Sequence, residues 1–260
     1  MSFPDAAAVL SGAAVGFSLG LIGGGGSILA VPLLLYVVGI RDPHVAIGTS
    51  ALAVSINAFV NLLGHWRAGT VHWPSAALFG VVGVVGAIAG SSAGKAVDGQ
   101  KLLALFALVM MAAGIAMLRP RSAGYWPVGA LDRMRGIRLA AVGGATGFAS
   151  GFFGIGGGFL IVPGIVLATG MPILNAIGCS LFSVAVFGLT TAVNYALSGF
   201  VAWSVAAEFI AGGAAGGWLG TKAAVRLAPK KQILSNTFAA VIFAVATYML
   251  VLAAKSISLL

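Results

Sequence analysis

Residues 21–27 read Leu-Ile-Gly-Gly-Gly-Gly-Ser, and residues 152–158 read Phe-Phe-Gly-Ile-Gly-Gly-Gly. Both glycine clusters lie inside long stretches without any charged residue, 6–40 and 139–207. Because glycine costs about 1 kcal/mol per residue in a helix interior, each cluster should interrupt an otherwise continuous apolar helix.

The surrounding sequence is typical of an integral membrane protein. Of its 260 residues, 60% are hydrophobic and only 7% are charged, whereas an average soluble domain is about 25% charged. Further uncharged runs cover 43–66, 68–94, 102–118 and 232–254. Together the runs predict about eight segments near the length of roughly 20 apolar residues that a helix needs to cross a bilayer. They do not alternate between apolar and polar residues, which disfavours a β-barrel, so we expect an all-α polytopic membrane protein.

The chain also contains an internal repeat. Shifting the sequence by 131 residues aligns glycines and prolines: Gly16 with Gly147, Gly20 with Gly151, Gly23 with Gly154, Gly25 with Gly156, Gly26 with Gly157, and Pro32 with Pro163. With one residue fewer, 46–50 aligns with 176–180 and 69–73 with 199–203. We therefore predict two homologous repeats, 1–118 and 138–260, joined by a basic cytoplasmic linker, 119–137.

Arginine and lysine residues set the predicted orientation. The linker region carries Arg119, Arg121, Arg133, Arg135 and Arg138, and the loop before the last helix carries Lys222, Arg226, Lys230 and Lys231. The positive-inside rule places both in the cytoplasm. Counting crossings back from them puts Arg67 inside and Arg41, Lys95, Lys101 and Lys255 outside. That count requires each glycine-interrupted segment to form a hairpin or to cross twice. With three spanning helices after it, each half then crosses an odd number of times, which inverts the second repeat relative to the first. Inverted repeats are typical of secondary transporters.

The glycine clusters themselves suggest an anion site. An interrupted helix leaves backbone groups unpaired in hydrocarbon, at several kcal/mol each, and is tolerated where those groups line a cavity. The short apolar stretches after the breaks, 27–38 and 159–169, would begin with helix N-termini, which present N–H donors and partial positive charge. Two such ends near the bilayer midplane would bind an anion. Helix packing is the alternative role, and it is the one predicted for Gly80, Gly83, Gly86, Gly90, Gly216 and Gly220.

Other polar residues have competing interpretations. Ser50, Asn57 and Asn61 share one helical face, and the matching positions hold Ser180, Phe187 and Thr191, with Asn194 and Tyr195 one turn later. They could line the site or form interhelical hydrogen bonds worth about 0.6 kcal/mol each, and the second role is favoured for Asn57, Asn61 and Thr191.

The ionisable residues point away from metal or covalent chemistry. Glu208 is an acid inside an apolar stretch, where a carboxylate suggests proton coupling, although its closeness to Trp203 also fits the headgroup level. His65 and His72 flank Arg67 and are expected to be solvated. A single cysteine, Cys179, excludes an intrachain disulfide and a multi-cysteine metal site. No cofactor, metal or nucleic-acid partner is predicted.

These motifs resemble the sulfite exporter TauE/SafE family, also called the toluenesulfonate uptake permease (TSUP) family. The similarity rests on Gly20–Gly26 with Pro32, on Gly48-Thr49-Ser50 and on His65-x-x-x-Gly69-x-Val71-x-Trp73. It recurs in Gly151–Gly158 with Pro163, in Gly178-Cys179-Ser180 and in Gly199-x-Val201-x-Trp203. The resemblance covers essentially the whole chain. It implies secondary transport of sulfite, sulfonates or other sulfur-containing anions across the bacterial inner membrane, usually outward.

The sequence therefore predicts a multi-pass exporter of a small sulfur oxyanion in the bacterial cytoplasmic membrane, surrounded by lipid, with a homodimer left open. The predicted substrate-binding residues are Gly23, Gly24, Gly25, Gly26, Ser27, Thr49, Ser50, Asn57, Gly154, Gly156, Gly157, Gly158, Cys179 and Ser180, and Glu208 is the candidate for proton coupling. Cys179 stands where the first repeat has Thr49. The competing interpretations are an anion channel and an importer; a membrane-embedded enzyme lacks a nucleophile–base or metal grouping, and a scaffold would not need two symmetric breaks.

Overall fold

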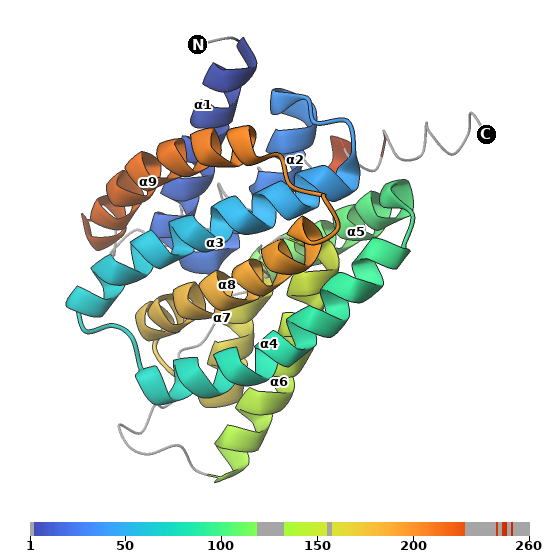
Figure 1. The fold of residues 1–260 in the computed structure, drawn as a ribbon. Coiled ribbons are helices and arrows are strands. Elements are labelled where there is room, and N and C mark those ends of the chain that lie inside the picture. Colours follow the sequence, from blue (N-terminus) through green and yellow to red (C-terminus); the bar gives the residue numbers. More distant parts are fainter. Residues whose placement is uncertain are drawn as a thin grey trace.

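The computed structural model describes residues 3–118, 133–154, 158–226, 243, 246–248 and 251, and every regular element in this part of the chain is a helix (Figure 1). The first helix, α1 (Phe3–Ile22), ends where Gly23 adopts a left-handed φ of 76°. The chain then folds back into the 3₁₀ helix η1 (Gly23–Leu29), which places Gly26 against Ser18 and Leu19 of α1. Only glycine adopts this backbone region readily, so the first residue of the cluster makes the turn.

The returning arm of this hairpin is helical throughout. After η1 it continues as α2 (Ala30–Leu33) and as the π-helical turn η2 (Leu34–Val38). The predicted interruption is therefore confirmed, but the returning arm begins at Gly23 and not, as predicted, at Ser27. Only Gly23 leaves right-handed geometry, and the other glycines of the cluster begin a new, tighter helix in which they are buried.

The second hairpin repeats this design. Helix α6 (Arg133–Phe153) ends at Gly154, whose φ is 65°, and α7 (Gly158–Thr169) is the returning arm. Residues 155–157 lie outside the described residues. In both hairpins the returning arm ends at the residue that the sequence predicted, Val38 and Thr169.

Longer helices follow each hairpin. They are α3 (Pro43–Arg67), α4 (Trp73–Ala96) and α5 (Gly99–Leu118), and then α8 (Ile173–Ala196) and α9 (Trp203–Arg226). Among the described residues, α3, α4 and residues 174–196 of α8 are long and apolar enough to cross a membrane. Asp42 caps α3 by accepting a hydrogen bond from His44 N at 2.8 Å, with Pro43 in the first turn, which fixes where this helix begins. Residues 119–132 are not described, and α6 begins at Arg133, inside the predicted linker.

Each hairpin packs on a helix from the other half of the chain. α1 lies along α9, and α6 lies along α4. Glycines of α1 face backbone carbonyls of α9, and glycines of α6 face those of α4: Gly12 with Phe209, Gly16 with Gly213, Gly20 with Gly217, Gly143 with Phe79, Gly147 with Gly83, and Gly151 with Ala87. A Cβ atom at any of these glycines would collide with the facing helix. The packing role predicted for Gly80, Gly83, Gly86, Gly90, Gly216 and Gly220 is confirmed, since a Cβ atom on each would overlap a neighbouring helix.

Helices α3 and α8 form the centre of the bundle and run in opposite directions (Figure 1). The N-terminal part of α3 meets the C-terminal end of α8, because Gly48 lies against Tyr195 and the carbonyl of Phe200. The N-terminal part of α8 meets the C-terminal end of α3 in the same way, because Gly178 lies against the carbonyl of Thr70.

Left-handed glycines mark the repeat in the backbone. Among the described residues they form three pairs at matched positions: Gly23 with Gly154, Gly39 with Gly170, and Gly69 with Gly199. Each pair occupies the same place in its half of the chain, namely the hairpin turn, the end of the returning arm and the loop after α3 or α8.

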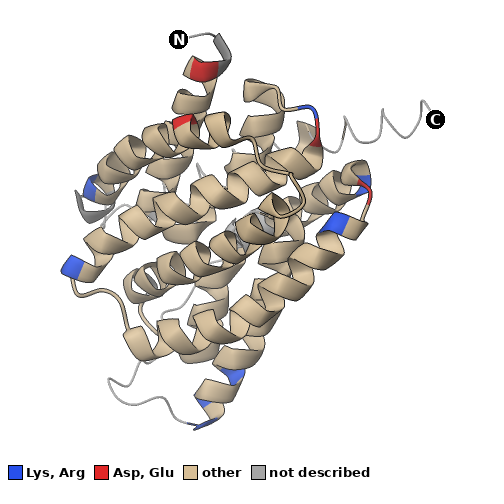
Figure 2. Ribbon diagram, in the orientation of Figure 1, with Lys and Arg blue, Asp and Glu red and all other residues tan. Residues whose placement is uncertain are grey.

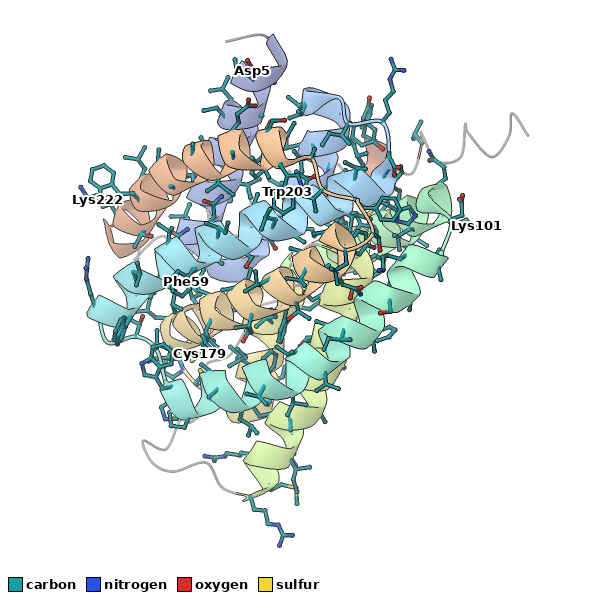
Figure 3. All side chains as sticks on the ribbon, viewed as in Figure 1. Asp5, Phe59, Lys101, Cys179, Trp203 and Lys222 are labelled. Carbon is teal, nitrogen blue, oxygen red and sulfur yellow. The ribbon has the colours of Figure 1, made fainter. Side chains whose placement is uncertain are left out.

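Among the described residues, charged side chains lie toward the ends of the helices, and the middle of the bundle is free of them (Figure 2). One end, called the basic end below, carries Arg67, Arg133, Arg135, Arg138 and Lys222. The opposite end carries Asp5, Arg41, Asp42, Lys95, Asp98 and Lys101; Figure 3 labels Lys222 on one side and Asp5 and Lys101 on the other. Between the ends, apolar side chains such as Phe59 and Val81 point outward, 57% and 68% exposed. This surface suits lipid rather than water.

Candidate functional site

The first glycine cluster, Gly23–Gly26, is called the first break below, and it lies against the N-terminal part of α8. Gly24 N donates a hydrogen bond to Ser180 Oγ at 3.4 Å, and Ser180 Oγ donates to Ile177 O at 2.8 Å. A Cβ atom on Gly23 would lie 2.9 Å from Ile177 Cγ2. Ser27 closes the turn from within, because its hydroxyl donates to Gly24 O at 2.8 Å. The glycines and serines of this break are fully buried.

The second break lies against α3 in the equivalent way. Ser50 Oγ donates to Gly154 O at 3.1 Å and to Ile47 O at 2.9 Å. The side chain of Ile47 packs directly on Gly154, where a Cβ atom would overlap it. Ser50 and Ser180 are thus matched residues that each hold the break of the opposite repeat. Gly156 and Gly157 lie outside the described residues.

The two breaks touch each other. A Cβ atom on Gly24 would lie 2.5 Å from Gly158 Cα and 2.8 Å from Val184 Cγ2, and one on Gly158 would overlap the backbone of Gly24. The sequence placed the clusters 131 residues apart, and the structure brings them into contact between α3 and α8. Backbone polar groups of both repeats therefore meet at one buried point.

Thr49 and Cys179 each bond the backbone of a connecting loop. Thr49 Oγ1 accepts a hydrogen bond from Ala202 N at 2.9 Å, just before α9. Cys179 Sγ accepts from His72 N at 3.3 Å, just before α4. The predicted ligand pair is thus symmetric, but each member is bonded to a loop rather than to a break.

Asn57 is not at the breaks either. It lies on α3 facing α9, beside Gly213, and it is fully buried. Neighbouring Asn61 donates to Asn57 O at 2.9 Å and accepts from Thr221 Oγ1 at 3.1 Å. The interhelical role predicted for Asn61 is confirmed by this bond to α9. Sequence reasoning missed Thr221, although it lies four residues after Gly217 and eight after Gly213, on the same face of α9.

The remaining ionisable candidates are near the helix ends. Glu208 is half-buried in the second turn of α9, after the exposed Trp203. His65 was expected to be solvated, and that expectation is wrong: its side chain is only 5% exposed, with Nδ1 3.0 Å from Thr70 Oγ1. His72 Nδ1 lies 2.9 Å from Ser75 Oγ. No three His, Cys, Asp or Glu side chains in the described part of the chain are grouped so as to hold a metal ion.

A lysine anchor at the end opposite the basic end was also missed. Lys95 Nζ donates to Asn194 O, Asn194 Oδ1 and Ser198 Oγ at 3.0, 2.8 and 2.8 Å. The ammonium group thus sits on the last carbonyls of α8, where the helix dipole favours a positive charge. The sequence signal was Lys95 in the last turn of an otherwise uncharged helix.

Known proteins resemble this chain along most of its length. The family model described as sulfite exporter TauE/SafE matches residues 8–249. A probable membrane transporter protein from Xylella fastidiosa (strain Temecula1) is 54% identical over 245 residues, covering 92% of each chain. The probable membrane transporter protein YunE of Bacillus subtilis is 29% identical over 224 residues, covering 77% of this chain and 81% of its own. No solved structure matches.

In the described part of the chain, the two glycine breaks meet within a band of apolar helices that carries no charged side chain, which suits a membrane transporter. The match of the family model over nearly all of the sequence establishes that this membrane protein belongs to the sulfite exporter TauE/SafE family of transporters.

Proposed function

We propose that the protein is a secondary transporter that exports small sulfur-containing anions, sulfite or an organosulfonate, across the bacterial cytoplasmic membrane. The observation that carries the proposal is the contact between the two glycine breaks, each held by a buried serine of the other repeat. Backbone N–H groups and hydroxyls are neutral donors, and they can surround an oxyanion without binding it too tightly to release. In this proposal Thr49 and Cys179 position loops rather than contact the substrate.

We further propose that the repeats are inverted and rock against each other about the breaks, as in other transporters built this way. Three observations support this part of the proposal. α3 and α8 run antiparallel, the hairpin of each repeat packs on the other repeat, and contacts recur at matched positions. The basic end would face the cytoplasm, because the described residues there are positive without an accompanying acid (Figure 2).

In the conformation described here, the serine hydroxyls are used internally. Ser50 donates to Gly154 O, and Ser180 donates to Ile177 O. Substrate binding would require these hydroxyls to rotate toward the anion, so that a bond to the charged ligand replaces the bonds that Ser50 and Ser180 now donate to carbonyls. A bound anion would separate Gly24 from Gly158, which couples occupancy of the site to movement of one repeat against the other.

The test is sulfite flux in proteoliposomes containing the parent protein, Ser50→Ala or Ser180→Ala. A hydrogen bond to a charged group contributes about 1.5–3 kcal/mol, so each variant should lose about tenfold or more in initial rate. Ser183→Ala is the matched control, because Ser183 is buried on the same helix and donates only to Cys179 O. Equal rates for all four proteins would refute the site.

An anion channel and an importer are the alternatives. Accelerated exchange of labelled sulfite against an unlabelled pool on the other side identifies a carrier, and a channel would show no such counterflow. Uptake compared in right-side-out and inside-out vesicles gives the direction. If Glu208 couples protons to export, Glu208→Gln should abolish the stimulation of flux by an imposed pH gradient while leaving exchange intact.

A further inference from the structure

The interface between α3 and α9 contains a line of buried polar side chains, called the polar seam here. On α3 it consists of Asn57 and Asn61, which face Gly213, Gly217 and Thr221 of α9, and of His65, one turn further along α3 toward the basic end. Both sets are spaced by four residues, so each lies along one face of its helix. The three α3 side chains are 0%, 3% and 5% exposed. The seam runs from the basic end toward the middle of the bundle.

Two members of the seam have hydrogen-bonding atoms without a partner. Neither the Oδ1 nor the Nδ2 atom of Asn57 is bonded, although the side chain is fully buried beside Gly213. His65 Nε2 is also buried and unbonded. Because Thr70 Oγ1 donates to His65 O, it accepts from His65 Nδ1, which leaves Nε2 as a bare acceptor. An unsatisfied buried group costs about 1–3 kcal/mol, so these atoms indicate a polar occupant.

The matched interface in the other half shows that packing alone does not require this polarity. α8 and α4 approach each other through the same backbone arrangement, but the residue at the position of Asn57 is Phe187. Its ring fills the space beside Gly83 and stacks on Phe79 with centroids 6.1 Å apart. Thr191, which matches Asn61, bonds only to Phe187 O of its own helix at 2.9 Å. An aromatic side chain therefore packs the interface between α4 and α8, so helix packing alone does not explain a buried asparagine at the matched position 57.

The seam extends from near Ser50, beside the breaks, to the positive charges at the basic end. Asn57 lies two helical turns, about 10 Å, from Ser50, which shares its face of α3 and holds the second break. At the other end, Arg67 follows His65 by two residues and Lys222 follows Thr221 directly. Lys222 stands over the ring of Trp218, with Nζ 3.4 Å from the ring centroid. Positive charges at the mouth would raise the local concentration of an anion.

We propose that the polar seam is the access path of the anion between the basic end and the breaks, with the Asn57 amide as a second, intermediate binding point. The ligand class is a small oxyanion with its remaining water, for which Asn57 Nδ2 supplies donors and Asn57 Oδ1 and His65 Nε2 accept hydrogen bonds from the water. The Phe79–Phe187 stack closes the matched interface in this conformation. This inference rests on the proposed function and adds the route by which the anion would reach the breaks.

Thiol labelling tests the path separately from transport. Cys179→Thr provides a cysteine-free parent, since threonine at the matched position 49 makes the same kind of bond. Asn61→Cys and Thr191→Cys are then compared in oriented membranes, using an impermeant thiol reagent that bears a sulfonate. Asn61→Cys should react at least ten times faster than Thr191→Cys, from the face of the basic end only, and sulfite should slow the reaction. A trimethylammonium reagent of similar size should react more slowly than the sulfonate.

The outcomes separate the two proposals. Equal labelling of Asn61→Cys and Thr191→Cys, or labelling only from the opposite face, would overturn the path even if the parent transports sulfite. Labelling that sulfite does not slow, in a parent that transports sulfite, would overturn anion binding in the seam. Labelling from the basic end in a parent that transports no sulfite would support the path and would refute the proposed substrate.

Discussion

Thr49 and Cys179 occupy matched positions on α3 and α8 and do the same structural work. The threonine hydroxyl accepts from Ala202 N, and the cysteine sulfur accepts from His72 N. Each bond fixes the loop that leads into α9 or α4, which are the helices on which the opposite hairpins pack. The exchange of oxygen for sulfur keeps an acceptor at this point, although the sulfur is the weaker one.

Thr49→Val should therefore destabilise the protein. Valine has nearly the shape of threonine but no acceptor, so the partly buried Ala202 N–H loses its partner, at a cost of about 1 kcal/mol. Thr49→Ser keeps the oxygen and serves as the control. Thermal unfolding of the purified protein in detergent should give a lower midpoint for Thr49→Val than for Thr49→Ser. Equal midpoints would show that this bond contributes nothing.

Left-handed glycines allow backbone strain to be separated from steric overlap. Gly23→Ala imposes a left-handed alanine, at about 1–2 kcal/mol, and also places Cβ 2.9 Å from Ile177 Cγ2. Gly39→Ala imposes the same backbone cost at φ 88° with nothing within 4 Å. Unfolding midpoints should rank the parent highest, Gly39→Ala next and Gly23→Ala lowest. A Gly23→Ala protein as stable as Gly39→Ala would contradict the close packing of the first break.

The sequence predicted the helical hairpins well and their packing poorly. The glycine clusters, their uncharged surroundings and the ends of the returning arms follow from local rules, because a left-handed turn and an apolar run are properties of a few consecutive residues. That α1 pairs with α9 and α6 with α4 could not be predicted, since it depends on which glycine faces lie opposite each other in the folded chain. For the same reason the partners of Thr49 and Cys179, which are more than a hundred residues away in the sequence, were missed.

A glycine-to-alanine substitution should have opposite effects on stability at two places, in α1 where it packs on α9 and on the exposed side of α3. In Gly16→Ala the new Cβ would overlap the Gly213 carbonyl, which forces the helices apart and should cost about 1–3 kcal/mol. In Gly64→Ala the nearest atom is Thr221 Cγ2 at 3.5 Å, an ordinary contact. Alanine should there stabilise α3 by up to about 1 kcal/mol. Unfolding midpoints on opposite sides of the parent are expected, and two shifts of the same sign would contradict the assigned packing.

At the scale of the whole molecule, two similar halves meet where the glycine breaks touch, but they differ in the side chains that fill the α3–α9 and α4–α8 interfaces. Matched serines hold matched breaks, whereas the position of Asn57 in the first repeat is occupied by Phe187 in the second. Under the proposed rocking of the repeats, the symmetric breaks would stay the common point of contact, and the unequal interfaces make one side polar in the arrangement described here. A transporter needs both features, because the site must stay central while access changes sides.

The inverted arrangement makes a prediction about matched loops. Ala68 follows α3 and Leu197 follows α8 at nearly equivalent positions of the two repeats, and both are exposed. In a parallel repeat these loops would face the same compartment. In the arrangement proposed here, Ala68 lies at the basic end and Leu197 at the opposite end. In the Cys179→Thr background, Ala68→Cys should be labelled by an impermeant reagent only in inside-out vesicles, and Leu197→Cys only in right-side-out vesicles. Labelling of both cysteines from one side would rule out inversion. Labelling of each cysteine from the side opposite to the expected one would keep inversion but reverse the positive-inside orientation. The basic end and the mouth of the polar seam would then lie outside the cell.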